Sequence, residues 1–182
     1  MKKGLIIAAA MILAVCLGVG GTLAYLFVKT QTVTNTFSPS DITLDLKETE
    51  RTYQMIPGVE MPKDPKVSAK GDLPYYVFVK VDKVNNPDTY LDYAINTGAN
   101  AWTAVPGVEN VYYIAVNGGE LAATSVLVGD KVTTKAGITK EQMNAIGNNK
   151  PQLIFTAYAI QQAGFNTPEA AWAQLKTQYT IQ

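Results

Sequence analysis

The first 24 residues are an apolar leader, and they determine which part of the chain is left to fold. Lys2 and Lys3 precede an uncharged run over residues 4–28, which small residues interrupt at 20–24 (GGTLA). A basic start, an apolar middle and small residues before a break are typical of a secretory signal peptide. The leader therefore predicts export of everything that follows it.

The end of the leader predicts where it is cut. Thr22 and Ala24 have the small side chains that a signal peptidase accepts at these two places. We expect cleavage after Ala24, so that the mature protein begins at Tyr25. On this interpretation, signal peptidase is a partner, the membrane is contacted only before cleavage, and the product is secreted.

Two alternatives to cleavage are open. Residues 4–28 carry no charge and are long enough to remain as an uncleaved anchor, because about 20 apolar residues span a bilayer. Lipidation at Cys16 is the other alternative, but Val15 is a poor fit for the small residue that a lipobox needs before the cysteine. Cys16 is better interpreted as one apolar residue of the leader.

The composition of the mature part limits how it is stabilised and what it binds. Cys16 is the only cysteine, so the exported domain has no disulfides and depends on burial and backbone hydrogen bonds. The chain has 15 basic and 15 acidic residues, and losing Lys2 and Lys3 leaves a net charge of −2. This charge disfavours nucleic acid as a partner, since binding to phosphates needs a basic face.

Alternating residues along the mature chain favour β-strands. Residues 25–37 (YLFVKTQTVTNTF) carry threonine at every second position from 30 to 36, which favours an extended segment, and Ser-Pro-Ser at 38–40 ends it. Residues 41–47 alternate apolar and polar side chains, as a half-buried strand does. The strongest strand pattern is at 74–84 (PYYVFVKVDKV), and a long apolar strand is expected at 153–160.

Turn residues between apolar runs predict how some strands connect. Asn117-Gly118 stands between the apolar runs 111–116 and 121–128. Because both turn residues tolerate a positive φ, this pattern predicts a β-hairpin. A weaker strand is expected at 90–95.

Cap residues predict two short helices. The first covers 140–146, where Thr139 caps the helix and Gln142 completes a capping box. The second runs over 167–176, with threonine at the cap and proline in the first turn. We therefore expect an all-β protein, an antiparallel β-sandwich or jelly roll with two short helices, preceded by an apolar signal helix.

The residues that most enzymes need are missing. The chain has no histidine, which removes the usual general base and zinc ligand and every triad built on histidine. Ser68 and Lys70 fall on one face of a strand, where they are best interpreted as solvated side chains. Asn86, Asp88 and Asp92 lack the dense ligand pattern of a calcium loop and fit a solvated turn. No catalytic residue, metal or cofactor is expected.

The aromatic residues are better explained by packing than by ligand binding. Most of them stand at alternating positions of the expected strands, where they fill the core and its rim. Tyr112 and Tyr113 are the candidates for an exposed ligand platform. Trp172 is expected to pack the last helix against the sheet.

Three segments in a fixed order carry a resemblance to a known family. They are GGTLAY at 20–25 followed by TNTF at 34–37 and DITL at 41–44; PG at 57–58 with KDPKV at 63–67 before YVFVKV at 76–81; and AYAIQQAGF at 157–165 followed by AAW at 170–172. Together they resemble the TasA/camelysin family of Gram-positive bacteria, whose precursors carry a signal read by the dedicated peptidase SipW. The resemblance covers nearly the whole chain.

The resemblance implies a secreted jelly-roll protein of the cell surface or biofilm matrix. Some family members polymerise into fibres, in which the freed N-terminal strand of one subunit completes a sheet of the next. This implies a homo-oligomer or a fibre with itself or a paralogue, and the domain organisation is a signal peptide at 1–24, a candidate donor strand at 25–37 and a jelly-roll domain at 38–182. The implied donor-strand residues are Leu26, Val28, Thr30, Thr32, Val33, Thr34 and Phe37.

Other interpretations remain beside the fibre. Residues 25–37 are equally consistent with an ordinary first strand that pairs within its own domain. A monomeric surface module that binds a glycan or peptide is the alternative function. Some relatives are labelled metallopeptidases, but a chain without histidine or a zinc motif gives that label no support.

Overall fold

The computed structural model describes residues 41–50, 52–98 and 101–181. These residues belong to one compact unit that spans 39–182. The signal helix, the cleavage site and the strand expected at 25–37 lie outside the described residues.

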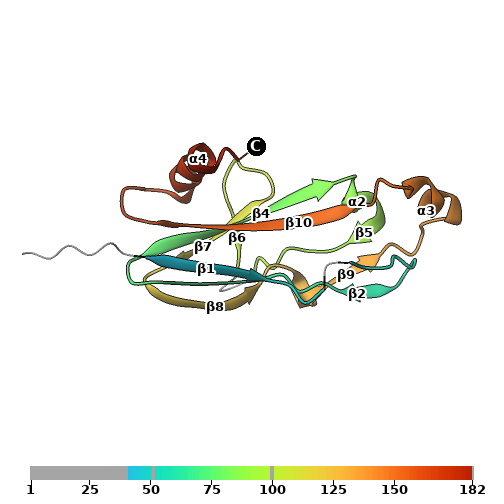
Figure 1. Ribbon diagram of the computed structural model, residues 1–182, viewed down its shortest axis with the longest axis horizontal. Coiled ribbons are helices and arrows are strands. Elements are labelled where there is room, and N and C mark those ends of the chain that lie inside the picture. Colours follow the sequence, from blue (N-terminus) through green and yellow to red (C-terminus); the bar gives the residue numbers. More distant parts are fainter. Residues whose placement is uncertain (1–40, 51, 99–100, 182) are drawn as a thin grey trace, which may run out of the picture. The chain divides into compact units, whose positions relative to one another are not determined.

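Strands dominate the described part of the chain, and every pair of neighbouring strands is antiparallel. They form three sheets, with the orders β1-β3-β8, β10-β4-β7-β6 and β2-β9-β5 (Figure 1). The strands are β1 (Ile42–Lys47), β2 (Glu60–Pro62), β3 (Lys66–Gly71), β4 (Tyr75–Val84), β5 (Leu91–Asp92), β6 (Thr103–Ala104), β7 (Val111–Val116), β8 (Gly119–Ser125), β9 (Lys131–Thr134) and β10 (Gln152–Gln161). The expectation of an all-β, antiparallel protein is confirmed.

Strand β4 is the centre of the core because both of its faces are covered. On one face, Val77 and Val79 are fully buried against residues of β3, and Val81 packs among residues of β2 and β9. On the other face, Tyr76 and Phe78 pack under helix α4 (Pro168–Tyr179) (Figure 1). Burial on both faces explains the nearly continuous apolar pattern of this strand.

The two helices predicted from their caps are present. Helix α3 (Lys140–Ile146) has the full capping box between Thr139 and Gln142. Helix α4 begins after Thr167, whose side chain accepts from the backbone N–H of Ala170, and ends at Tyr179, three residues beyond the prediction. Trp172 is 2% exposed and packs this helix against the four-stranded sheet, as expected.

A third α-helix in the described residues was not predicted. Helix α2 (Pro87–Tyr90) is a single turn that follows Asn86, which has a left-handed backbone. A four-residue segment is too short to show helical periodicity, and its Asn-Pro-Asp residues are also typical of a turn. The weaker strand predicted at 90–95 is reduced to β5 and an isolated bridge between Ile95 and Leu127. A 3-10 turn, η1 (Val128–Asp130), precedes β9.

The predicted hairpin is wrong. Strands β7 and β8 follow each other in the chain, but β7 pairs with β4 and β8 pairs with β3, in a different sheet. The positive φ values fall at Gly118 (87°) and Gly119 (85°), one residue later than an Asn-Gly hairpin turn requires. This turn therefore carries the chain from one sheet to the other.

Candidate functional site

The outer strands of two different sheets, β1 and β10, lie on the same side of the unit. Within the described residues, β1 pairs only with β3 and β10 pairs only with β4. The two strands lie side by side without pairing with each other (Figure 1). We call this line between Ile42–Lys47 and Gln152–Gln161 the open seam.

The two strands of the open seam run in opposite directions. Ile42, where β1 begins, pairs with Gly71. Gly71 lies close to both Tyr75 and Ile42. A Cβ atom added to Gly71 would be 3.1 Å from the ring of Tyr75 and 3.3 Å from the Ile42 side chain. Tyr75 in turn pairs with Gln161, where β10 ends. The start of β1 and the end of β10 therefore share one end of the open seam.

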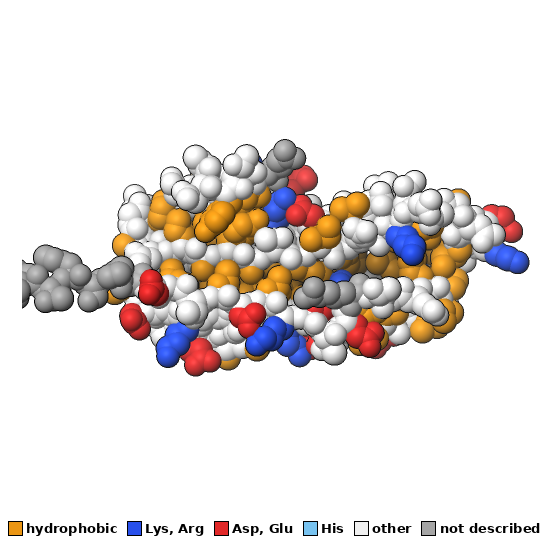
Figure 2. All heavy atoms as spheres, viewed as in Figure 1, with side chains coloured by type: hydrophobic (Ala, Val, Ile, Leu, Met, Phe, Trp, Pro, Cys, Tyr) orange, Lys and Arg blue, Asp and Glu red, His pale blue; other side chains and the backbone are white. Residues whose placement is uncertain are grey.

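The core is incompletely covered along the open seam. Leu44 and Leu46 on β1 and Phe155 on β10 pack against the core but stay partly exposed. By contrast, Val77 and Val79 of the central strand are 0% exposed. Figure 2 shows hydrophobic side chains at the surface along the line between β10 and β1. Apolar side chains beside two outer strands, each of which pairs with a single strand among the described residues, are typical of a site that accepts another strand.

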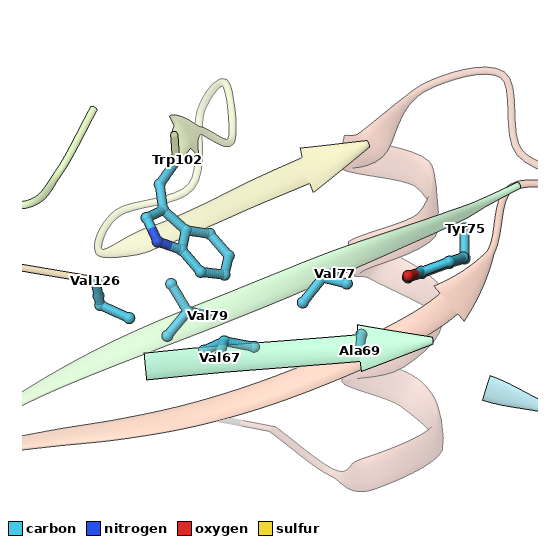
Figure 3. Packing of buried hydrophobic residues seen from close by; sticks show 7 residues of the cluster. All are labelled: Val67, Ala69, Tyr75, Val77, Val79, Trp102 and Val126. Carbon is cyan, nitrogen blue, oxygen red and sulfur yellow. The ribbon is translucent and has the colours of Figure 1, made fainter. Parts of the chain in front are cut away.

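The opposite side of the two sheets is closed. There β6 and β8 are the outer strands, and Trp102, directly before β6, is inserted between the sheets. Its indole Nε1–H donates to the carbonyl of Ser125 at 2.9 Å, which ties this side of one sheet to the other. Figure 3 shows its ring beside Val79 and Val126. This side also ends in two outer strands, but it differs from the open seam in that Trp102 packs between the sheets.

A cavity of about 890 Å³ lies at one end of the open seam. It is bounded by the end of β1, by the 48–56 loop (of which 48–50 and 52–56 are described), by the start of β10 and by helix α3. Its apolar lining includes Leu46, Met55, Met61, Leu91, Val132, Met143, Ile146, Leu153, Ile154 and Phe155. This size suits a ligand or an inserted side chain, and three methionines allow the lining to adapt to its shape.

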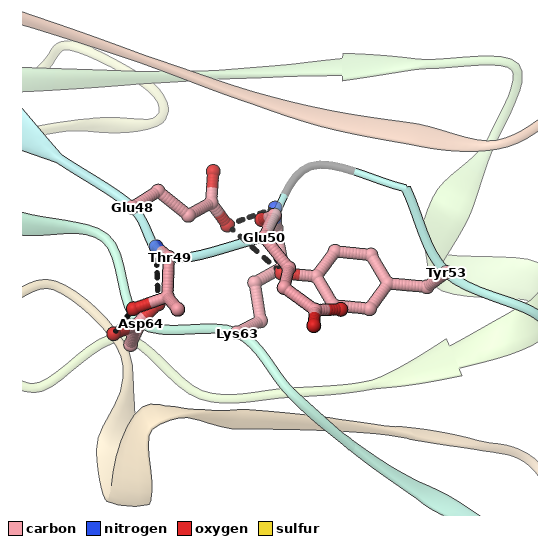
Figure 4. A network of polar contacts seen from close by, with 6 residues as sticks. All are labelled: Glu48, Thr49, Glu50, Tyr53, Lys63 and Asp64. Carbon is pink, nitrogen blue, oxygen red and sulfur yellow. Dashed lines mark hydrogen bonds and ion pairs between the residues drawn. The ribbon is translucent and has the colours of Figure 1, made fainter.

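An ion pair lies in the wall of this cavity. Lys63 Nζ is 2.6 Å from Glu48 Oε1, and their side chains are only 10% and 17% exposed. The ammonium also lies 5.3 Å from the ring centres of Tyr53 and Phe155. The Tyr53 hydroxyl donates to the carbonyl of Glu50 and lies 3.4 Å from Glu48 Oε1 (Figure 4). These contacts hold the loop that follows β1 against the start of β10.

A second contact anchors the same loop. The Asp64 carboxylate accepts from the backbone N–H of Thr49 at 2.9 Å and from its hydroxyl at 2.7 Å (Figure 4). These bonds from Thr49 lower the pKa of Asp64. The cavity wall is thus positioned by side-chain contacts rather than by strand pairing.

Burial beside these carboxylates predicts a late titration of Tyr53. Burial, and then the charge of Glu48, raise its pKa from 10.0 to about 12. In the unfolded chain the hydroxyl ionises near pH 10, so its contribution to stability is complete below pH 10 and is lost as the pH rises to 12. In a pH titration followed by tyrosinate absorbance, Tyr53→Phe should lack one ionisation step that the parent shows near pH 12. If the step that Tyr53→Phe lacks lies near pH 10 instead, the pKa of Tyr53 is not raised, which would contradict this environment.

The carboxylates considered for calcium are engaged elsewhere. Asp88 accepts from the hydroxyl of Tyr93 and pairs with Lys83 at 2.9 Å, and these two contacts lower its pKa. Asp92 lies 3.8 Å from Lys135. In the described ranges, no three Cys, Asp or Glu side chains come together as a metal site requires.

The other candidate residues have structural surroundings. Ser68 and Lys70 share the outer face of β3, as their spacing predicted. Tyr112 and Tyr113 are half-buried and pack against the core clusters on either face of their sheet. The cleavage residues Thr22, Ala24 and Tyr25, and the donor-strand residues, lie outside the described residues.

Sequence reasoning missed the cavity and its ion pair. Glu48, Tyr53 and Lys63 form no motif, and they meet only because the loop after β1 folds back on β2. The one signal was Lys63-Asp64-Pro65, which contributed to the family resemblance but suggested no role for Lys63.

Comparisons with known proteins identify no relative of this chain. No family model matches the chain, and neither the curated proteins nor the solved structures contain a significant match.

Within the part of the chain that the structure describes, no helix has the length and apolar character needed to cross a bilayer. What the structure defines is the class: a mostly β protein of antiparallel sheets with an open seam on one side.

Proposed function

We propose that this chain is a secreted structural protein of the cell surface or biofilm matrix, a jelly-roll domain that assembles into fibres by strand donation. The observation that carries the proposal is the open seam. Among the described residues, β1 and β10 each pair with one strand only and border an incompletely covered core, while Trp102 packs between the sheets on the opposite side. An edge of this kind accepts a further strand, and in the proposed fibre a strand from another copy supplies it.

Residues 25–37 have the length and pattern of the missing strand. Their 13 residues reach about 40 Å when extended, and the six-residue β1 is about 20 Å long. Backbone hydrogen bonds to an open edge supply affinity, and alternating side chains set the register. Cleavage after Ala24 frees this segment from the membrane, so assembly begins only after export.

Strand donation between copies leads to an open polymer. The donor segment and the open seam are different surfaces of the same chain, so each copy that donates a strand keeps a seam for another donor. A contact of this heterologous kind forms a filament when its rotation does not close a ring. The partner is a second copy of this chain or a paralogue with the same two surfaces.

Deleting residues 25–37 from the secreted protein tests the proposal. We expect the parent to form filaments visible by electron microscopy, and the deletion variant to elute as a folded monomer. Residues 41–181 retain every described strand, so the circular dichroism of the two proteins should match. Filaments from the deletion variant would contradict the donor role, and a parent that stays monomeric would contradict the assembly function.

A further inference from the structure

The cavity contains apolar side chains that the core does not cover. Four lining residues lie outside the three clusters of the buried core, namely Met55, Met143, Ile146 and Ile154. Met143 and Ile146 are three residues apart and so share one face of α3, and no residue of this helix is buried. Figure 2 shows hydrophobic side chains at the surface below α3. The cavity therefore leaves apolar surface that a ligand can remove from water.

The methionines indicate what kind of ligand this is. The chain has five methionines, and the three that follow the leader, Met55, Met61 and Met143, all line the cavity. They come from the 48–56 loop, β2 and α3. Unbranched thioether side chains adapt to a ligand that has no rigid shape. The apolar lining side chains also offer no hydrogen-bond donor to the carbonyl groups of an inserted peptide. This lining therefore favours an aliphatic chain.

The charges around the cavity indicate the head group of the ligand. Glu48, Lys63 and Lys150 are the charged side chains among the described lining residues. Glu48 and Lys63 neutralise each other at 2.6 Å. Lys150 is exposed, and among the described residues no carboxylate pairs with its ammonium. An apolar interior is thus combined with one uncompensated positive charge at the exposed rim, which suits an anionic group.

We propose that the cavity binds a free fatty carboxylate, with its aliphatic chain against the three methionines and its carboxylate at Lys150. The volume of about 890 Å³ lies within the range of small-molecule sites. The aliphatic chain covers Met143 and Ile146 and thereby holds α3 against the start of β10. Binding does not depend on strand donation, so a monomer and a fibre subunit bind the ligand alike.

Titration of the secreted protein with laurate, followed by calorimetry, tests the proposal. We expect saturable binding of a single laurate per chain, and binding of uncharged lauryl alcohol with lower affinity. Lys150→Met keeps the apolar stem and should weaken laurate binding by about two- to fivefold, as expected for an exposed ion pair, without changing the binding of the alcohol. The matched control is Lys140→Met, which removes a charge that does not line the cavity and should change neither affinity.

Two further measurements place the aliphatic chain. Met143→Gln should weaken the binding of both ligands by about tenfold, because it removes an apolar contact. The variant should keep the circular dichroism of the parent, since Met143 is not buried in the core. Hydrogen peroxide converts accessible methionine to its sulfoxide. Laurate should slow the oxidation of Met55 and Met143 in the parent, measured by mass spectrometry of their peptides.

Each contrary outcome overturns a defined part of the proposal. Laurate that shows no saturable binding overturns the site, and so does binding that leaves the oxidation of Met143 unchanged. If Lys150→Met weakens the binding of lauryl alcohol as much as that of laurate, the carboxylate does not lie at Lys150. Sedimentation with phosphatidylglycerol vesicles, without binding of free laurate, would show a membrane surface in place of a fatty carboxylate site.

Discussion

Replacing Trp102 with alanine is expected to lower the free energy of unfolding by about 3–5 kcal/mol. Trp102 is 1% exposed and lies between the two sheets, in contact with buried valines of β3 and β4. Its removal leaves a large cavity and takes the hydrogen-bond donor from the carbonyl of Ser125. Urea unfolding of the parent and the variant, followed by tyrosine and tryptophan fluorescence, measures the difference.

Two further variants show which part of Trp102 matters. Trp102→Phe keeps most of the apolar contact but not the N–H donor, so we expect an intermediate loss. Val128→Ala removes apolar atoms from a residue that is 51% exposed and should change stability by less than about 0.5 kcal/mol. A loss below about 1 kcal/mol for Trp102→Ala would show that Trp102 does not hold the closed side together.

The closed side explains how a domain with an open seam can fold alone. Trp102 connects the outer strands of two sheets on one side, and helix α4 covers the outer face of the four-stranded sheet. The fully buried residues of β4 lie between these two supports. The core is therefore held together without a contribution from a further strand at the seam, as the proposed function requires.

Local patterns were sufficient to predict the elements that depend on local interactions. The capping box of Thr139 and Gln142 and the alternating residues of β4 involve neighbours in the chain, and both were predicted from the sequence. The hairpin failed because the partner of a strand is chosen by long-range packing. Asn117-Gly118 marks a turn, but the turn residues do not specify which strand β8 then joins.

The candidate site could not be predicted for the same reason. The open seam results from strand order, since β1 and β10 are more than 100 residues apart and become neighbours only in the fold. The cavity likewise depends on where α3 and the 48–56 loop come to lie. Only residues 25–37, which we propose as the donor segment, carry an alternating pattern that is visible in the sequence itself.

Replacing Lys63 with methionine is expected to lower the free energy of unfolding by about 3 kcal/mol. The substitution keeps the apolar stem but leaves the Glu48 carboxylate, 17% exposed, without the ammonium that lies 2.6 Å away. A carboxylate with so little solvent and no counter-ion is costly, and the 48–56 loop should loosen with it. Urea unfolding measures the stability, and proteolysis at the loop reports its loosening.

The double variant Lys63→Met with Glu48→Leu decides whether the missing partner is the cause. Replacing both charges by apolar groups removes the uncompensated carboxylate, so we expect the double variant to recover to within about 1 kcal/mol of the parent. The exposed pair of Lys131 and Glu60 is a matched control, with the same 2.6 Å separation but side chains 47% and 55% exposed. Lys131→Met should cost less than about 1 kcal/mol, because water screens that pair. If Lys63→Met costs no more than Lys131→Met, the ion pair does not stabilise the cavity wall.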